Sequence, residues 1–274
     1  MVLESLINPI KAEREPWEML FIGMIYSSLA IIISHYIFRE DASLIMIFLT
    51  SFAAVPLIYG AIKIEEKKDI LYEDEKFLIK EHGKALSFFM FLFLGFVISF
   101  LVWFIFLPSD TTSILFKTQL RDLRRIEMVS YATTGNFTNL FTTLSKIFFN
   151  NVKVMIFSLL FSLCYGFGAI FILTWNASII ATAIGNFIRN ATGGYLALVS
   201  VGLVRYMIHG IPEIMAYFMA ALAGGIISVA VIRHDFGSEK FRHIMIDSLD
   251  LIIGSLVLLF IAALLEVFVT PLLF

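Results

Sequence analysis

The sequence has few charged residues and a single cysteine. Asp, Glu, Lys and Arg make up 15% of its 274 residues, whereas about 25% is usual for a soluble domain. Cys164 cannot form an internal disulfide, and its place in an apolar run marks it as a packing residue. Because the net charge is −2 and there is no basic stripe to neutralise phosphates, we expect no nucleic-acid partner.

Enzyme motifs are also missing. The chain contains no His-Glu-x-x-His zinc motif, no Gly-x-Ser-x-Gly elbow and no glycine-rich phosphate loop followed by a lysine. His209 and Glu213 alone supply too few ligands for a zinc site. We therefore expect no enzymatic activity, no bound metal and no cofactor.

Hydrophobic residues, in contrast, make up 59% of the chain, and its mean hydropathy is +0.91. A soluble fold could not cover so much apolar surface with so few charges. In lipid the backbone must satisfy its own hydrogen bonds, so we expect an all-α, polytopic transmembrane bundle. A spanning helix needs about 20 mostly apolar residues. Six runs meet this criterion: Met19–Phe38, Ser43–Ile62, Ala85–Leu107, Asn151–Trp175, Pro212–Ile232 and Leu249–Val269.

The segment Asn176–Ile211 is harder to assign. Ala177–Ile188 is too short to span, and we interpret it as a re-entrant or interfacial half-helix, which membranes tolerate where it is buried or lines water. Tyr195–Ile208 follows a Gly-Gly pair, and we interpret it as a short, tilted crossing. The expected total is then about seven crossings.

Lysine and arginine in the loops predict the orientation. Lys63–Lys84 carries six lysines, and Arg233–Arg242 carries two arginines and a lysine, so we place both segments in the cytoplasm. They can share a side only if an even number of crossings joins them, which Tyr195–Ile208 provides. The chain is then a multi-pass protein of the cell membrane, with its N-terminus in the cytoplasm and its C-terminus outside.

Two segments outside the apolar runs carry much of the charge. Ser113–Ser130 has apolar residues at helical spacing and charge on the other face, which predicts an amphipathic helix on the membrane surface. Its positive charge on the outer side argues against the orientation above. Ile64–His82 is a mixed-charge run, either a solvated helix face with i,i+4 pairs or a partner-docking surface. We treat residues 1–274 as one membrane domain, in which residues 1–84 form a helical hairpin and a charged loop.

Ionisable residues inside membrane segments are costly and are therefore candidates for function. His209 and Glu213 flank Gly210 and Pro212, and we expect these two to break the chain into separate helices. Glycine favours a helix end, and proline favours the first turn of the next helix. Glu213 would then complement the positive end of the second helix. A structural corner and a polar site both fit this segment.

Glu266, in the last apolar run, is expected at the same depth in the membrane as the segment from His209 to Glu213. It follows Asp250 by sixteen residues, which places it about 24 Å along a helix, toward the outer leaflet. Arg205 and His209 are the nearest basic candidates at that depth. We predict an intramembrane cluster of Arg205, His209, Glu213 and Glu266, which serves either as a structural clamp or as a proton or cation site.

Small residues recur beside this segment. Ala216, Ala220 and Gly224 lie four residues apart, a spacing that lets helices approach closely in lipid. We favour packing within one chain, and a homo-oligomer is the alternative.

Three short motifs resemble the stage II sporulation protein M family. His209–Ile214, before an Ala/Gly-rich helix, resembles the hallmark of the family. Asn150–Val154, which opens a glycine-containing helix, and Leu265–Pro271, at the C-terminal end, resemble it as well. Together these motifs span residues 147–271, and the stretch from Asn8 to Trp17 looks like the archaeal branch.

The resemblance implies a polytopic membrane protein with no established enzymatic activity. It marks His209, Gly210, Pro212, Glu213 and Glu266 as family-like positions without assigning them chemistry. The bacterial namesake is a membrane anchor for a complex of cell-wall hydrolases during engulfment.

We therefore expect a non-enzymatic scaffold or anchor, whose partners are the lipid bilayer and a membrane or cell-envelope protein. The alternative is a small transporter or channel that uses the polar cluster. The broken segment 176–211 favours that alternative, and the lack of a clear inverted repeat opposes it. An intramembrane enzyme ranks third.

Overall fold

A computed structural model of the chain describes residues 15–71, 75–131, 137–165, 169–190, 195–233 and 238–273. Side chains are described for these residues except 69–71, 75–80, 125–131, 137–139, 165, 195–205, 233 and 240. The described backbone is helical, without a strand, which confirms the all-α prediction. The prediction for Asn8 to Trp17 lies largely outside these residues.

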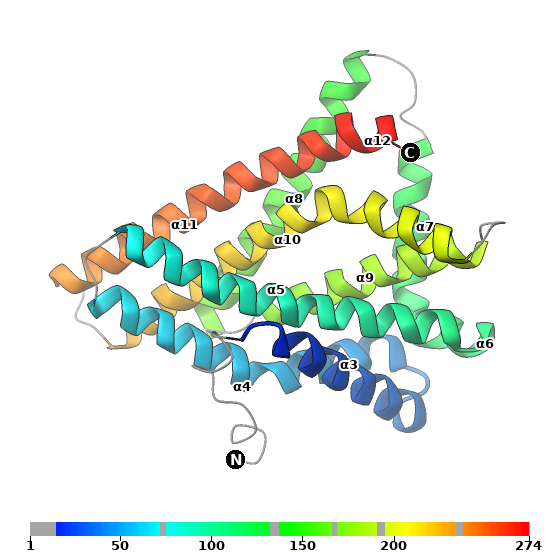
Figure 1. The fold of residues 1–274 in the computed structure, drawn as a ribbon, viewed down its shortest axis with the longest axis horizontal. Coiled ribbons are helices and arrows are strands. Elements are labelled where there is room, and N and C mark those ends of the chain that lie inside the picture. Colours follow the sequence, from blue (N-terminus) through cyan, green and yellow to red (C-terminus); the bar gives the residue numbers. More distant parts are fainter. Residues whose placement is uncertain are drawn as a thin grey trace.

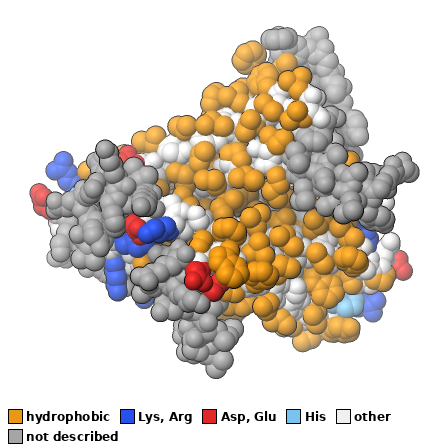
Figure 2. All heavy atoms as spheres, viewed as in Figure 1, with side chains coloured by type: hydrophobic (Ala, Val, Ile, Leu, Met, Phe, Trp, Pro, Cys, Tyr) orange, Lys and Arg blue, Asp and Glu red, His pale blue; other side chains and the backbone are white. Residues whose placement is uncertain are grey.

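Seven of the described helices are long and apolar enough to cross a membrane. Figure 2 shows hydrophobic side chains over the middle of the visible face, with the charged side chains mainly toward its two ends. This distribution suits a bundle that spans a bilayer. The seven helices are α3 (Glu18–Ile37), α4 (Ala42–Leu71), α5 (Glu75–Phe106), α8 (Phe137–Tyr165), α9 (Ala169–Asn190), α10 (Tyr195–Arg233) and α11 (Glu239–Leu264).

Shorter elements lie at one end of the bundle. Helices α6 (Ser109–Leu115) and α7 (Lys117–Tyr131) follow α5, and α7 crosses the end of the bundle at a steep angle to α5 (Figure 1). The amphipathic helix predicted over Ser113–Ser130 is therefore present, but it is broken at Phe116. Phe116 and its neighbour Leu115 are buried against the bundle. A π-helix (η1, Leu265–Val269) and α12 (Thr270–Leu273) end the chain.

The seven helices are not the seven predicted crossings. The predicted run Asn151–Trp175 divides, because α8 ends at Tyr165 and α9 begins at Ala169. Ala177–Ile188 is the second part of α9, a full-length apolar helix, and the predicted half-helix is wrong. Polar residues had interrupted the apolar pattern there. Their side chains bond to carbonyls of their own helix, as when Asn176 Nδ2 donates to Ile172 O at 2.8 Å, so α9 tolerates them in lipid.

The predicted helix break at Gly210 and Pro212 is also wrong. Both residues lie inside α10, and Tyr195–Ile208 is the first part of that helix rather than a separate crossing. Proline removes one backbone hydrogen bond and bends a helix. In lipid, however, ending the helix would expose several more unpaired backbone groups, so continuing it costs less. Helix α10 is visibly curved along its length (Figure 1).

The order of these helices places the two basic segments on one side if each of the seven crosses the membrane. Four apolar helices (α5, α8, α9 and α10) separate Lys63–Lys84 from Arg233–Arg242, which is the even number that the orientation requires. Which side is cytoplasmic stays a prediction. Within Lys63–Lys84, α4 extends to Leu71 and α5 begins at Glu75, so the mixed-charge run is largely helical.

Helix α10 lies at the centre of the bundle. In the most apolar 18-residue stretch of α10, 72% of the residues are buried, whereas the share in the corresponding stretch of α8 is 22%. Ala216 and Ala220 are fully buried. A Cβ on Gly224 would overlap the Leu159 carbonyl oxygen of α8, so this end of the small-residue stripe packs within the chain.

A second close crossing joins α3 and α5. A Cβ on Gly95 would overlap the Leu20 carbonyl oxygen and lie 3.0 Å from Gly23 Cα. The two glycines therefore let the backbones of α3 and α5 touch, a contact that the sequence analysis did not anticipate.

Candidate functional site

Polar side chains from α10 meet others from the C-terminal end of the chain. His209, Glu213 and Tyr217 follow one another at four-residue spacing on one face of α10, and Glu266 and Thr270 do the same in η1 and α12. The Tyr217 hydroxyl donates to Glu213 Oε1 at 2.7 Å, and Thr270 Oγ1 lies 3.3 Å from His209 Nδ1. Glu266 lies one turn before Thr270, at the end of the chain that contacts α10. We call these five residues the carboxylate cluster.

The π-helix shapes one side of the carboxylate cluster. Such wide turns are rare and are frequently found at functional sites. The Leu265 carbonyl accepts from the Thr270 backbone N–H across the wide turn, and the Thr270 hydroxyl donates to the same carbonyl at 3.1 Å. When the hydroxyl proton points to Leu265, the Thr270 oxygen can accept from His209 Nδ1 in the tautomer that carries a hydrogen there.

The charges of the carboxylate cluster are unusual for a structural clamp. Tyr217 is fully buried, whereas Glu213 and Glu266 are each partly exposed. Two ionised carboxylates on neighbouring apolar helices would repel strongly in a membrane, because the low dielectric does not screen them. The pair is relieved when it shares a proton or when a cation lies between its oxygens.

The structure places three of the four predicted residues on elements that contact each other, His209 and Glu213 on α10 and Glu266 on η1. Arg205 lies one turn before His209 in α10, and its side chain is outside the described part of the chain. Tyr217 and Thr270 were not predicted. Their four-residue spacing from Glu213 and Glu266 is the signal that would have found them.

A metal site does not emerge from this geometry. Among the residues that the structure describes, no group of three or more His, Cys, Asp and Glu side chains is placed to hold a metal ion. The carboxylate cluster offers two carboxylates and one imidazole whose Nδ1 faces a hydroxyl, a set better suited to protons or weakly bound cations.

A second ionic network joins α4 and α5 at the other end of the bundle. Glu65 has a fully buried side chain, which accepts from Lys68 Nζ at 2.6 Å and lies 2.8 Å from His82 Nδ1. Lys68 Nζ also lies 3.1 Å from Glu81, which pairs in turn with Lys84. Part of the mixed-charge run therefore holds two helices together rather than forming a solvated face. Sequence spacing could not show this, because the pairs with His82 and Glu81 cross between helices.

Arg189 performs a structural task at the end of α9. Its Nη2 donates to the carbonyl of Ile105 at 3.0 Å and to that of Leu107, and its guanidinium lies 5.1 Å from the Phe104 ring centroid. The carbonyls at the C-terminal end of α5 lack partners within the helix and carry partial negative charge. Arg189 therefore caps α5 and fixes the ends of α5 and α9 together.

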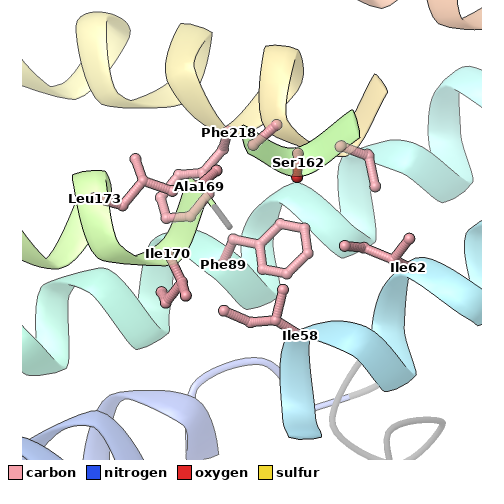
Figure 3. Close-up of a pocket in the computed structure, with 10 residues that line it drawn as sticks. Ile58, Ile62, Phe89, Ser162, Ala169, Ile170, Leu173 and Phe218 are labelled. Atoms are coloured by element: carbon pink, nitrogen blue, oxygen red, sulfur yellow. The ribbon is translucent and has the colours of Figure 1, made fainter. Parts of the chain in front are cut away.

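The small cavity inside the bundle is apolar. It has a volume of about 20 Å³ and lies among α4, α5, α8, α9 and α10. Figure 3 shows Ile58, Ile62, Phe89 and Phe218 around it, with Ser162 the one polar side chain among its lining residues. A space of this size and lining does not suit an ion. Polar chemistry is better placed in the carboxylate cluster.

Comparison with known protein families gives a match over most of the chain. Residues 44–271 match the family model described as stage II sporulation protein M. The match extends well beyond residues 147–271, where the motifs lie, and takes in α4 and α5. A search of curated proteins and a search of solved structures each found no match.

Proposed function

Because the chain belongs to the stage II sporulation protein M family, with seven helices long and apolar enough to span a membrane, we propose that it acts in the membrane without enzymatic chemistry, as a small transporter or channel. The carboxylate cluster is its proton or cation site. The observation that carries this proposal is the contact of α10 with η1 and α12, where Thr270 meets His209 and where Glu213 and Glu266 each lie one turn from that pair.

Two carboxylates at membrane depth need a physical reason to be there. A helix clamp would pair opposite charges, because a like-charged pair weakens the contact that it joins. A proton or a cation that binds between Glu213 and Glu266 removes the repulsion, and its release restores it. Tyr217 holds Glu213 in place from the buried side, so one carboxylate is positioned while the other sits on the π-helix.

Flux into liposomes tests the proposal. Purified protein is reconstituted in vesicles that contain a dye sensitive to pH, Na⁺ or K⁺, and a gradient of the matching ion is applied in turn. We expect flux of one of these ions and its loss in Glu266→Gln, which keeps the shape of the side chain and removes its charge. Glu239→Gln, at an exposed position early in α11, is the matched control and should retain the flux. Absence of flux in the natural protein, or full flux in Glu266→Gln, would contradict the proposal.

The second candidate is a scaffold or anchor for a membrane or cell-envelope complex. The observation that favours it is the uncovered surface of α8, which exposes Phe149, Phe157 and Phe161. An apolar helix of a partner protein could cover this surface as well as lipid does. A photo-crosslinker at Phe157 should then give one discrete product in native membranes, whereas a crosslinker at Phe52 on α4 should not. This product should survive Glu266→Gln, which separates the two candidates.

A further inference from the structure

An open groove of about 460 Å³ lies where α3 passes into α4 and α6 passes into α7. One wall is acidic and consists of Glu40 and Asp41, in the turn between α3 and α4. The other wall is basic and consists of Lys117, Arg121 and Arg124, which share one face of α7. All five side chains are exposed, so a ligand from outside the bundle can reach both walls.

Buried hydrogen bonds hold the two walls at a fixed separation. The Ser43 hydroxyl, at the start of α4, lies 2.9 Å from Thr118 Oγ1 and donates to Gln119 Oε1 at 2.8 Å. Gln119 is fully buried, and its Nε2 donates to Ser178 Oγ of α9 at 3.2 Å. Helix α7 is thus fastened to α4 and α9 beneath the groove. A ligand would meet a preformed site, which lowers the ordering cost of binding.

An apolar track leads from the groove along α4. Leu44 lines the groove, and Phe48 and Phe52 follow it at four-residue spacing. These side chains are 48%, 56% and 68% exposed, and the two phenylalanine rings stack with centroids 6.1 Å apart. The track lies in a helix that is apolar enough to span the membrane, so it extends from the groove into the bilayer.

We propose that this groove binds the headgroup of a zwitterionic phospholipid, with one acyl chain along Leu44, Phe48 and Phe52. The guanidinium groups of Arg121 and Arg124 suit the phosphate, because their planar donors match its oxygens. Glu40 and Asp41 suit the positively charged amine at the other end of the headgroup. A purely anionic headgroup would satisfy the basic wall and be repelled by the acidic one.

Lipid retention by the full-length protein tests this assignment. The protein is purified in detergent, mixed with phosphatidylethanolamine or phosphatidylglycerol, and analysed by native mass spectrometry. The natural protein should retain more phosphatidylethanolamine than phosphatidylglycerol. Arg121→Ala should weaken retention about fivefold, the value expected for one basic residue near a lipid surface. Arg242→Ala, an exposed arginine in α11, is the control and should change retention little.

Two further measurements test the acidic wall and the apolar track separately. The double change Glu40→Gln and Asp41→Asn should abolish the preference for phosphatidylethanolamine while the protein still binds phosphatidylglycerol. Soluble glycerophosphoethanolamine, which lacks acyl chains, should compete poorly. Equal losses in Arg121→Ala and Arg242→Ala, a preference of the natural protein for phosphatidylglycerol, or full competition by the soluble headgroup would each overturn the proposal.

Discussion

Replacing Gly95 by alanine should separate α3 from α5. A Cβ at this position would overlap the Leu20 carbonyl oxygen and lie 3.0 Å from Gly23 Cα, whereas ordinary contacts begin at 3.4 Å. Because both neighbours are backbone atoms, no side chain can turn aside. The two helices must therefore move apart by about an ångström, which loosens the close packing along their contact.

The sign of the change in the free energy of unfolding distinguishes a packing effect of Gly95→Ala from an effect of helix propensity. Alanine favours a helix over glycine by about 1 kcal/mol, whereas an overpacked contact costs about 1–3 kcal/mol. Gly95→Ala should therefore lower the free energy of unfolding by about 1–2 kcal/mol. Gly83→Ala is the matched control in the same helix, because a Cβ on Gly83 meets nothing within 4 Å. That change should raise the free energy of unfolding by up to about 1 kcal/mol.

Unfolding of the purified protein in mixed micelles, titrated with a denaturing detergent, provides the assay. A distance measurement between spin labels on α3 and α5 reports the separation directly. If Gly95→Ala is as stable as Gly83→Ala and the label distance is unchanged, the glycine contact does not hold α3 against α5.

Three other substitutions test interactions described above, each by the same unfolding assay. Glu65→Gln should lower the free energy of unfolding by about 3 kcal/mol, because it leaves Lys68 and His82 facing a neutral amide; a loss below about 1 kcal/mol would contradict a stabilising network. Arg189→Ala should cost about 2 kcal/mol and speed hydrogen exchange at the end of α5, and unchanged exchange would refute the cap. Tyr217→Phe removes one hydrogen bond and should cost about 1 kcal/mol; no change would show that Glu213 is held by other contacts.

The sequence located those helices whose apolar runs end in polar residues. The predicted run Met19–Phe38 corresponds to α3 within one residue at each end. The predicted run Ala85–Leu107 lies within the apolar part of α5, Glu81–Phe106, except for Leu107. Between residues 150 and 211 the same criterion failed. Local polarity divided α9, although Asn176, Ser178 and Thr182 bond to carbonyls of their own helix. A Gly-x-Pro sequence suggested an end to α10. Lipid penalises an unwound backbone more than a bend, and hydropathy alone does not include that penalty.

Three residues of the candidate site could be predicted because depth in a membrane can be estimated from residue counts. His209, Glu213 and Glu266 were grouped on that basis, and they lie on elements that contact each other. The groove between the α3–α4 turn and α7 could not be predicted, since its walls come from segments more than 70 residues apart in the chain. Counting along the sequence gives depth but not which helices are neighbours.

The π-helix lets the end of the chain carry one residue more than a regular helix would, without changing where Thr270 lies. A π turn contains about one residue more than an α turn. Deleting one residue from 267–269 would therefore convert the wide turn into a regular α turn, and Thr270 would keep about the same direction from the helix axis, toward His209. Glu266 would then precede Thr270 by three residues in place of four, which keeps both on one face of the helix. A family member one residue shorter here could lack the wide turn and still retain the site, so a single-residue gap in an alignment of this region does not by itself exclude the site.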